Sequence, residues 1–135
     1  MSGHRQIEHT ADLAFEIWGA DFGELLSEAA RAVIAVMTDA QSVRGVDRRD
    51  VEIEALDDED RLVRWLNEVL YLALVEGFVV HDAALESTPA GLRGYAVGKA
   101  DARASIVTEV KSATYHDLVV RRDGDRWMAR VVMDV

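Results

Sequence analysis

Two stretches of the chain place apolar residues at the spacing of an amphipathic helix. The first covers residues 22–37 and forms a broad apolar stripe over about four turns. Asp21 precedes it as a typical N-cap residue, and Glu24 completes a capping box three residues later. The second covers residues 62–74. It follows the acidic run 57–60, which favours a helix N-terminus, and Gly77 is a good stop signal.

Alternating and short apolar runs predict strands elsewhere. Residues 13–17 and 51–55 alternate apolar with polar or small side chains, which is typical of a strand with one buried face. Further strands are predicted at 78–81, 84–87, 92–97, 115–122 and 126–134. Asp123-Gly124-Asp125 is a hairpin turn signal between the last two. Residues 98–111 show no clear period, and we expect a loop with one helical turn.

The order of these elements indicates an α+β protein. Two helices with one apolar stripe each need the face of a sheet to cover. We therefore predict a two-layer sandwich, in which a mixed β-sheet carries both long helices on one face. The pattern leaves the strand order open. With no repeat and no linker, residues 1–135 are expected to form a single domain.

Composition and charge narrow the function classes. The 135 residues contain no Cys, which excludes disulfides, thiolate metal sites and a Cys nucleophile. The formal net charge is -10, and residues 1–60 hold 15 acidic against 5 basic side chains. An acidic chain repels phosphate backbones, so direct nucleic-acid binding is not expected. The excess fits a solvated surface, cation binding or docking to a basic partner.

The longest apolar run and the N-terminal residues indicate where in the cell the protein is expected. Residues 69–75 are the longest apolar run, far shorter than a membrane span needs. The first six residues carry no apolar signal region. We therefore expect a soluble, cytoplasmic protein without membrane association.

Three segments carry candidate chemistry, and the first is 8–12, Glu-His-Thr-Ala-Asp. Its titratable side chains fit a metal or acid–base site at a sheet edge. The alternative is a turn in which Thr10 or Asp12 caps backbone N–H groups. The second segment is Asp134-Val135, directly after a predicted strand. Its carboxylates, joined by Asp12, would suit a Ca²⁺- or Mg²⁺-type site, whereas the alternative is an exposed chain end.

The third segment, 109–117, is polar and leads into a predicted strand. It contains Lys111, one of only two Lys in the chain. His116 and Asp117 are neighbours, and neighbouring strand residues point to opposite faces, so they cannot belong to one triad. An ordinary solvated strand face is the alternative. Nucleotide-binding loops, nucleophile elbows and His-Glu-x-x-His motifs are absent from the sequence.

Four segments together resemble the archease family. They are 8–12 (EHTAD), 63–71 (VRWLNEVLY), 109–116 (EVKSATYH) and 127–135 (WMARVVMDV). Each is weak alone, but they occur in the family's order and span nearly the whole chain.

The resemblance implies a protein cofactor and not a catalyst. Archeases assist the tRNA-splicing RNA ligase, which joins 3′-phosphate or cyclic-phosphate ends to 5′-hydroxyl ends after GMP transfer to an active-site His. They promote this guanylylation and multiple turnover. The resemblance also implies a divalent cation, Ca²⁺ first with Mg²⁺ or Mn²⁺ possible, held by Asp12, Asp134 and Val135. His9, Lys111 and His116 are candidates for contact with the ligase.

Two other functions stay open from the sequence. One is a small metal-dependent phosphoesterase that uses Asp12, His9 and Asp134, which would need a metal with open positions and a water nucleophile. The other is a chaperone-like interaction module with a structural cation.

Overall fold

The computed structural model describes residues 2–7, 12–39 and 45–135. Within these residues, two α-helices, seven strands and one short 3₁₀ helix follow each other. In order they are β1 (Gly3–Ile7), β2 (Leu13–Gly19), α1 (Phe22–Met37), β3 (Asp47–Glu54), α2 (Asp58–Leu74), β4 (Val79–Thr88), β5 (Gly91–Lys99), η1 (Arg103–Ser105), β6 (Ser112–Asp123) and β7 (Arg126–Asp134).

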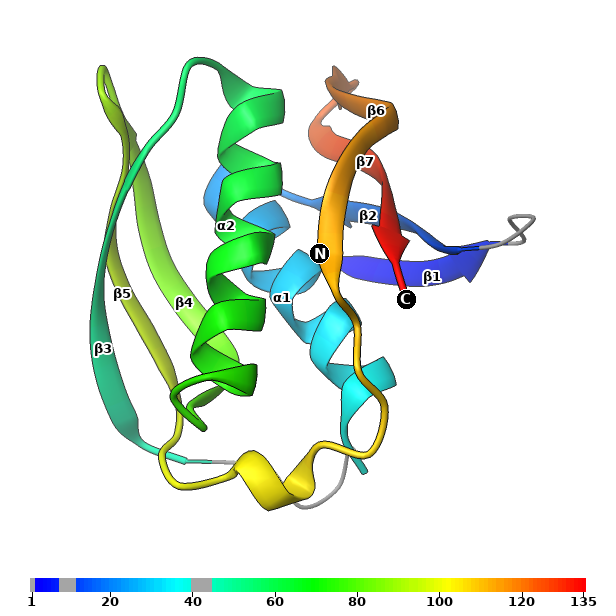
Figure 1. Cartoon of the computed structure of the whole chain (residues 1–135). Helices are drawn as coiled ribbons and strands as arrows, with labels where there is room; N and C mark the ends of the chain where they lie inside the picture. The colour runs from blue at the N-terminus through cyan, green and yellow to red at the C-terminus, as the bar shows by residue number, and fades with distance from the viewer. Residues whose placement is uncertain (1, 8–11, 40–44) are drawn as a thin grey trace.

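The strands form two separate antiparallel sheets. The first has the order β1-β2-β7-β6 and the second the order β3-β5-β4. Both helices contact strands of both sheets, so they form a middle layer between them (Figure 1). The α+β class is therefore confirmed, while the single mixed sheet with both helices on one face is wrong. The helices bury apolar side chains toward two sheets, because apolar residues continue around much of each helix.

The N-terminal ends of the helices follow the predicted capping chemistry. The Asp21 side chain accepts a hydrogen bond from the Glu24 N–H at 2.7 Å, and Glu24 accepts from the Ala20 N–H at 3.2 Å. Asp57 caps α2 in the same way, by accepting from the Asp60 N–H at 2.8 Å. The second helix therefore starts at Asp58, one turn earlier than its apolar pattern indicates.

Several strand boundaries differ from the predicted ones. The strand β1 has the polar sequence GHRQI at a sheet edge, so it carries no apolar alternation to detect. The predicted runs 78–81 and 84–87 belong to one strand, β4, with a register shift between Val80 and Asp82. The hairpin at 123–126 and the single helical turn within 98–111 are confirmed. Gly77 follows α2 with a φ of 70°, as a glycine stop requires.

The core lies between the helices and the two sheets. Its largest fully buried side chains include Trp65 of α2, Phe15 of β2 and Phe78, which directly precedes β4. In the four-stranded sheet, Phe15, Ile17 and Val131 point to this core, so the alternate residues of β2 and β7 point outward. No helix in the described parts of the chain is both long and apolar enough to cross a membrane.

Candidate functional site

The pairing of β2 with β7 brings the two candidate cation ligands to one end of the four-stranded sheet. The last residue pair in this ladder is Leu13 with Met133. Asp12 precedes Leu13 and Asp134 follows Met133, so each lies one residue beyond that pair. Two residues more than 120 positions apart in the sequence thus meet at the same sheet end.

The first residues of β6 lie at the same place. Ser112 pairs with Asp134 on the other side of β7, and the Lys111 N–H donates a hydrogen bond to the Asp134 carbonyl at 2.8 Å. The structure therefore brings Asp12, Asp134 and Lys111 together. Lys111 reaches this end through its backbone, and its side chain is exposed.

The chemistry of this sheet end fits a hard cation in part. Asp12 is half-buried, Asp134 is exposed, and Val135 is 49% exposed. Carboxylate and main-chain oxygens are the ligands that Ca²⁺ and Mg²⁺ take, and water completes their shells at open sites. Among the described residues, no three His, Cys, Asp or Glu side chains lie close enough together to hold a metal ion. Residues 8–11, which include His9, lie outside the described residues.

His116 is at a different place on β6. The pairing of β6 with β7 shifts register between Thr114 and Val119, and Asp117 within this bulge has a φ of 53°. The bulge turns neighbouring side chains toward each other, so His116 Nε2 lies 3.3 Å from Asp117 Oδ2. The expectation that these two side chains point apart is wrong, because the strand is interrupted there.

A buried carboxylate beside this bulge was not predicted. Asp60, 6% exposed, accepts hydrogen bonds from the Tyr115 hydroxyl, from the Leu56 N–H at 2.9 Å and from Arg64 Nε at 3.0 Å. The Tyr115 hydroxyl lowers the pKa of Asp60 most; burial opposes this, and the Leu56 N–H and Arg64 lower it further. The same contact raises the pKa of Tyr115. The cluster ties the start of α2 to β6.

Arg64 also belongs to this cluster. It forms an ion pair with Asp60, which lies one turn earlier in α2. Burial, and then the charge of Glu76, raises the pKa of Glu68. Beside the cluster lies an open hollow of about 420 Å³, at whose rim the Leu56 side chain is 90% exposed.

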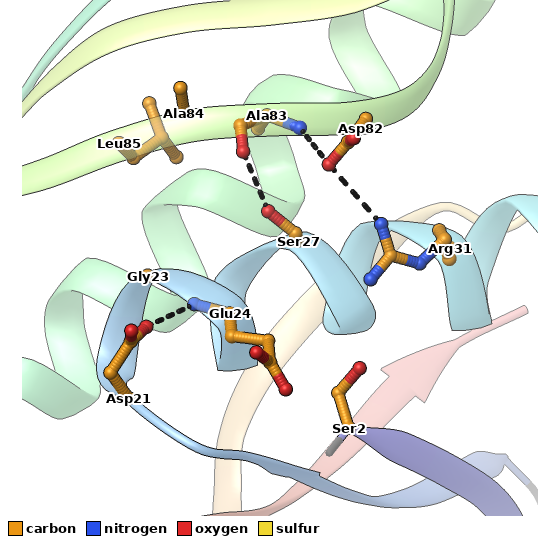
Figure 2. Close-up of a pocket in the computed structure, with 10 residues that line it drawn as sticks. All are labelled: Ser2, Asp21, Gly23, Glu24, Ser27, Arg31, Asp82, Ala83, Ala84 and Leu85. Atoms are coloured by element: carbon orange, nitrogen blue, oxygen red, sulfur yellow. Dashed lines mark hydrogen bonds and ion pairs between the residues drawn. The ribbon is translucent and has the colours of Figure 1, made fainter.

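A larger polar hollow of about 560 Å³ lies between the start of α1 and β4 (Figure 2). Its walls include Asp21, Glu24, Ser27 and Asp82. The Ser27 hydroxyl donates to the Ala83 carbonyl at 2.8 Å, which joins α1 to β4. Asp21 and Glu24 cap the start of α1, and Ser27 binds β4, so the first role of these polar groups is to hold the local structure together.

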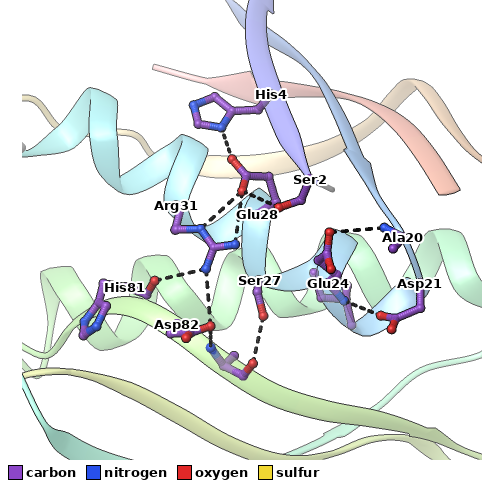
Figure 3. A network of polar contacts seen from close by, with 12 residues as sticks. Ser2, His4, Ala20, Asp21, Glu24, Ser27, Glu28, Arg31, His81 and Asp82 are labelled. Atoms are coloured by element: carbon purple, nitrogen blue, oxygen red, sulfur yellow. Dashed lines mark hydrogen bonds and ion pairs between the residues drawn. The ribbon is translucent and has the colours of Figure 1, made fainter. Parts of the chain in front are cut away.

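The network behind this hollow centres on Glu28 of α1 (Figure 3). Glu28 is 8% exposed and binds His4 of β1, the Ser2 hydroxyl at 3.2 Å and Arg31 at 3.1 Å. Arg31 continues to Asp82 of β4 at 3.3 Å. Burial disfavours the Glu28 carboxylate, but the hydrogen bonds and charges of His4 and Arg31 outweigh it, so the pKa of Glu28 is lowered.

These pKa shifts predict acid sensitivity. Because the pKa of Glu28 is lower in the folded state, its contribution is complete above about pH 4.5, the ordinary Glu value, and is lost as the pH falls below it. At pH 7, Glu28→Gln should cost about 1–3 kcal/mol of folding free energy. The melting temperatures of variant and parent should converge toward pH 3, as measured by thermal unfolding. A Glu52→Gln variant on exposed β3 is the control, and a constant gap at all pH values would contradict the assignment.

One sequence signal could have indicated Glu28. It lies three residues after Leu25 and four before Ala32, both fully buried, so it occupies the buried side of its helix. Asp60 gave no such signal, because its partner Tyr115 is 55 residues away.

Comparison with known proteins agrees with the family resemblance of the four sequence segments. The sequence model of the archease protein family (MTH1598/TM1083) matches residues 4–135. The protein archease of Methanopyrus kandleri is 34% identical over 96% of this chain and 97% of its own length. That of Archaeoglobus fulgidus is 36% identical, with 98% of each chain covered.

Two solved structures share the fold. The solution structure of Methanobacterium thermoautotrophicum protein 1598 superposes with a TM-score of 0.77 at 29% identity and covers 98% of this chain and 99% of the other. The crystal structure of an archease, possible chaperone, from Thermotoga maritima gives 0.61 at 28% identity and covers 97% and 96%. The chain, with its two helices between two antiparallel sheets, belongs to the archease family.

Proposed function

We propose that this protein activates a tRNA-splicing RNA ligase, the enzyme that joins 3′-phosphate or cyclic-phosphate RNA ends to 5′-hydroxyl ends. It acts in the cytoplasm as a cofactor of the ligase and catalyses no reaction itself. It promotes transfer of GMP to the ligase and supports repeated turnover. The observation that carries the proposal is the meeting of Asp12, Asp134 and Lys111 at one sheet end, in a chain of the archease family.

A divalent cation belongs to this proposal. Asp12 and Asp134 would hold it with oxygen atoms of Val135, and Ca²⁺ is preferred over Mg²⁺ or Mn²⁺ because it accepts irregular oxygen shells with several waters. When bound, such a cation supplies positive charge at an otherwise acidic surface. The β2–β7 ladder supports this assignment, because Asp12 and Asp134 flank its last pair, Leu13 with Met133.

The same sheet end supports docking to the ligase. Lys111 is exposed beside the two carboxylates, so the site presents both signs of charge to a partner. His9 is proposed to contact the ligase from the neighbouring segment. His116, at the bulge of β6, is proposed as a contact further along this strand. A partner that binds only one state of the ligase would shift its population toward that state.

The test is ligation with limiting enzyme. The ligase from the same organism is mixed with excess RNA carrying 3′-phosphate and 5′-hydroxyl ends, GTP and Mn²⁺. Products per ligase are counted with and without this protein. We expect about one product per ligase without it and many with it. Equal counts from a ligase that completes one turnover would overturn the proposal.

A second candidate function rests on the exposed apolar rim of the hollow beside Asp60. The Leu56 side chain is 90% exposed there and could bind apolar segments of a client protein. This reading agrees with the words "possible chaperone" in the description of the Thermotoga maritima protein. Suppression of aggregation of unrelated proteins, lost in Leu56→Ser, would favour it.

A further inference from the structure

The outward face of the four-stranded sheet carries an arginine cluster that the function above does not use. Arg5 on β1, Arg121 on β6, and Arg126 and Arg130 on β7 form this cluster. Arg130 pairs across the sheet with Glu16 and Val119, and Arg121 pairs with Met128. Directly paired residues of antiparallel strands point to the same face.

The charge of this arginine cluster is mostly uncompensated. Glu16 is the carboxylate in the middle of the face, and it is already bound to Arg5. Arg121, Arg126 and Arg130 form no ion pair with any residue that the structure describes. Other carboxylates lie at the two ends of the face: Asp123, which pairs across the strands with Arg126 at the hairpin, and Asp134 at the candidate cation site. The face therefore has a positive centre between acidic ends.

An aromatic ring lies within the same face. A Cβ atom at Gly3 would be 2.5 Å from the Trp18 indole, so the indole lies over the backbone of the edge strand β1. The guanidinium carbon of Arg126 is 5.7 Å from the centre of the ring. A hollow of about 260 Å³ opens here between Arg5, Trp18, Arg126 and Met128. It places a flat apolar surface next to two cationic groups.

The spacing of the arginines favours an extended chain of phosphates over a single phosphate ion. Arg126 and Arg130 are four residues apart on one strand, which is about 13 Å at the rise of a β-strand. These two arginines are too far apart to bind one phosphate together, but they can contact separate phosphates of an extended chain. Guanidinium groups suit phosphate oxygens, and an indole suits stacking of a base.

We infer that the outward face of the four-stranded sheet binds a single strand of RNA. Charge averaged over the whole chain argues against nucleic-acid binding, but an anion at this face meets the local field of three unpaired arginines. The inference rests on the proposed function in one respect, the identity of the RNA: it would be the strand whose ends the ligase joins. It assigns the protein a substrate contact in addition to its contact with the ligase.

The experiment measures fluorescence anisotropy of an unstructured 12-nucleotide RNA with a 5′ fluorescein and a 3′-phosphate. The full chain is titrated at 50 mM salt, and binding by the parent protein is expected. Arg121→Glu combined with Arg126→Glu should weaken binding at least tenfold. Arg48→Glu combined with Arg93→Glu is the matched control, because it makes the same charge change on the outward face of the other sheet and should alter binding less than twofold.

Two further measurements distinguish binding of an RNA strand from non-specific attraction between charges. With three phosphate contacts, raising the salt from 50 to 200 mM should weaken binding about 20-fold. Trp18→Leu should weaken it at least fivefold if a base stacks on the indole. Thermal unfolding of each variant shows whether the fold is intact, and the charge-reversal pair keeps the test decisive if Trp18→Leu fails to fold.

Three results would overturn the inference: no binding by the parent protein at 50 mM salt, equal weakening by both double variants, or equally tight binding of a poly-Glu peptide of the same length. The last result would assign the face to an acidic protein segment. Guanylylation of the ligase is measured separately without RNA. If this protein does not stimulate guanylylation but still binds RNA, only the proposed function is overturned. If it stimulates guanylylation but does not bind RNA, only this inference is overturned.

Discussion

Replacing Asp12 and Asp134 together by Asn is expected to abolish the stimulation of ligase turnover while the protein stays folded. The two side chains flank the last pair of the β2–β7 ladder, and neither is fully buried. Asn keeps the shape of each side chain but removes both negative charges that a hard cation needs. Because surface changes of this kind cost within about 0.5 kcal/mol each, the melting temperature should change by only a few degrees.

The measurements are products per ligase, cation binding by calorimetry and thermal unfolding. Asp50→Asn with Asp125→Asn is the control, since both residues are exposed and lie away from this sheet end. It should bind the cation and stimulate the ligase like the parent protein. Full stimulation by the Asp12/Asp134 double variant, with cation binding lost, would show that this site is not the working part.

The largest loss of stability is expected from Trp65→Ala, about 3–5 kcal/mol. The Trp65 side chain is completely buried, and its Nε1–H donates to the Leu26 carbonyl at 2.8 Å. The substitution removes the largest side chain of the core and also one hydrogen bond to a buried carbonyl of α1. Trp65→Phe restores most of the apolar volume, so its smaller cost isolates the lost hydrogen bond, about 0.5–1.5 kcal/mol.

Urea unfolding at equilibrium gives these free energies, provided that the slope m stays constant. Tyr71→Ala is the control on the same helix, because the Tyr71 side chain is 48% exposed and should cost less than about 1.5 kcal/mol. An equal loss from Trp65→Ala and Tyr71→Ala would mean that the two helices do not depend on this contact.

The helices and the last hairpin could be predicted because their determinants are local. The Asp21 cap, the apolar spacing after it and the Asp123-Gly124-Asp125 turn each act within a few residues. The full burial of Trp65 depends instead on distant segments, because α2 is covered on both sides. The division into two sheets depends on which strands pair, and periodicity carries no information about that choice.

For the candidate sites too, the sequence indicates single residues, but only the fold shows which of them meet. Asp12 and Asp134 could be named from the sequence as hard-oxygen residues near strand ends, but only the register shows that they meet. The Asp60–Tyr115 contact requires α2 to pack on β6. The arginine cluster joins Arg5 of β1 to three arginines of the β6–β7 hairpin, and only the strand pairing shows that they share one face.

The pairing of β2 with β7 also imposes an order of events on a ribosome. Strand β2 leaves the exit tunnel early, but its partner emerges roughly a hundred residues later, which takes several seconds at about 5–20 residues per second. During that time the growing chain holds β1, β2 and α1 without the strand that completes their sheet. Asp12 meets Asp134 only after this delay, so the candidate cation site cannot form in a nascent chain that lacks β7.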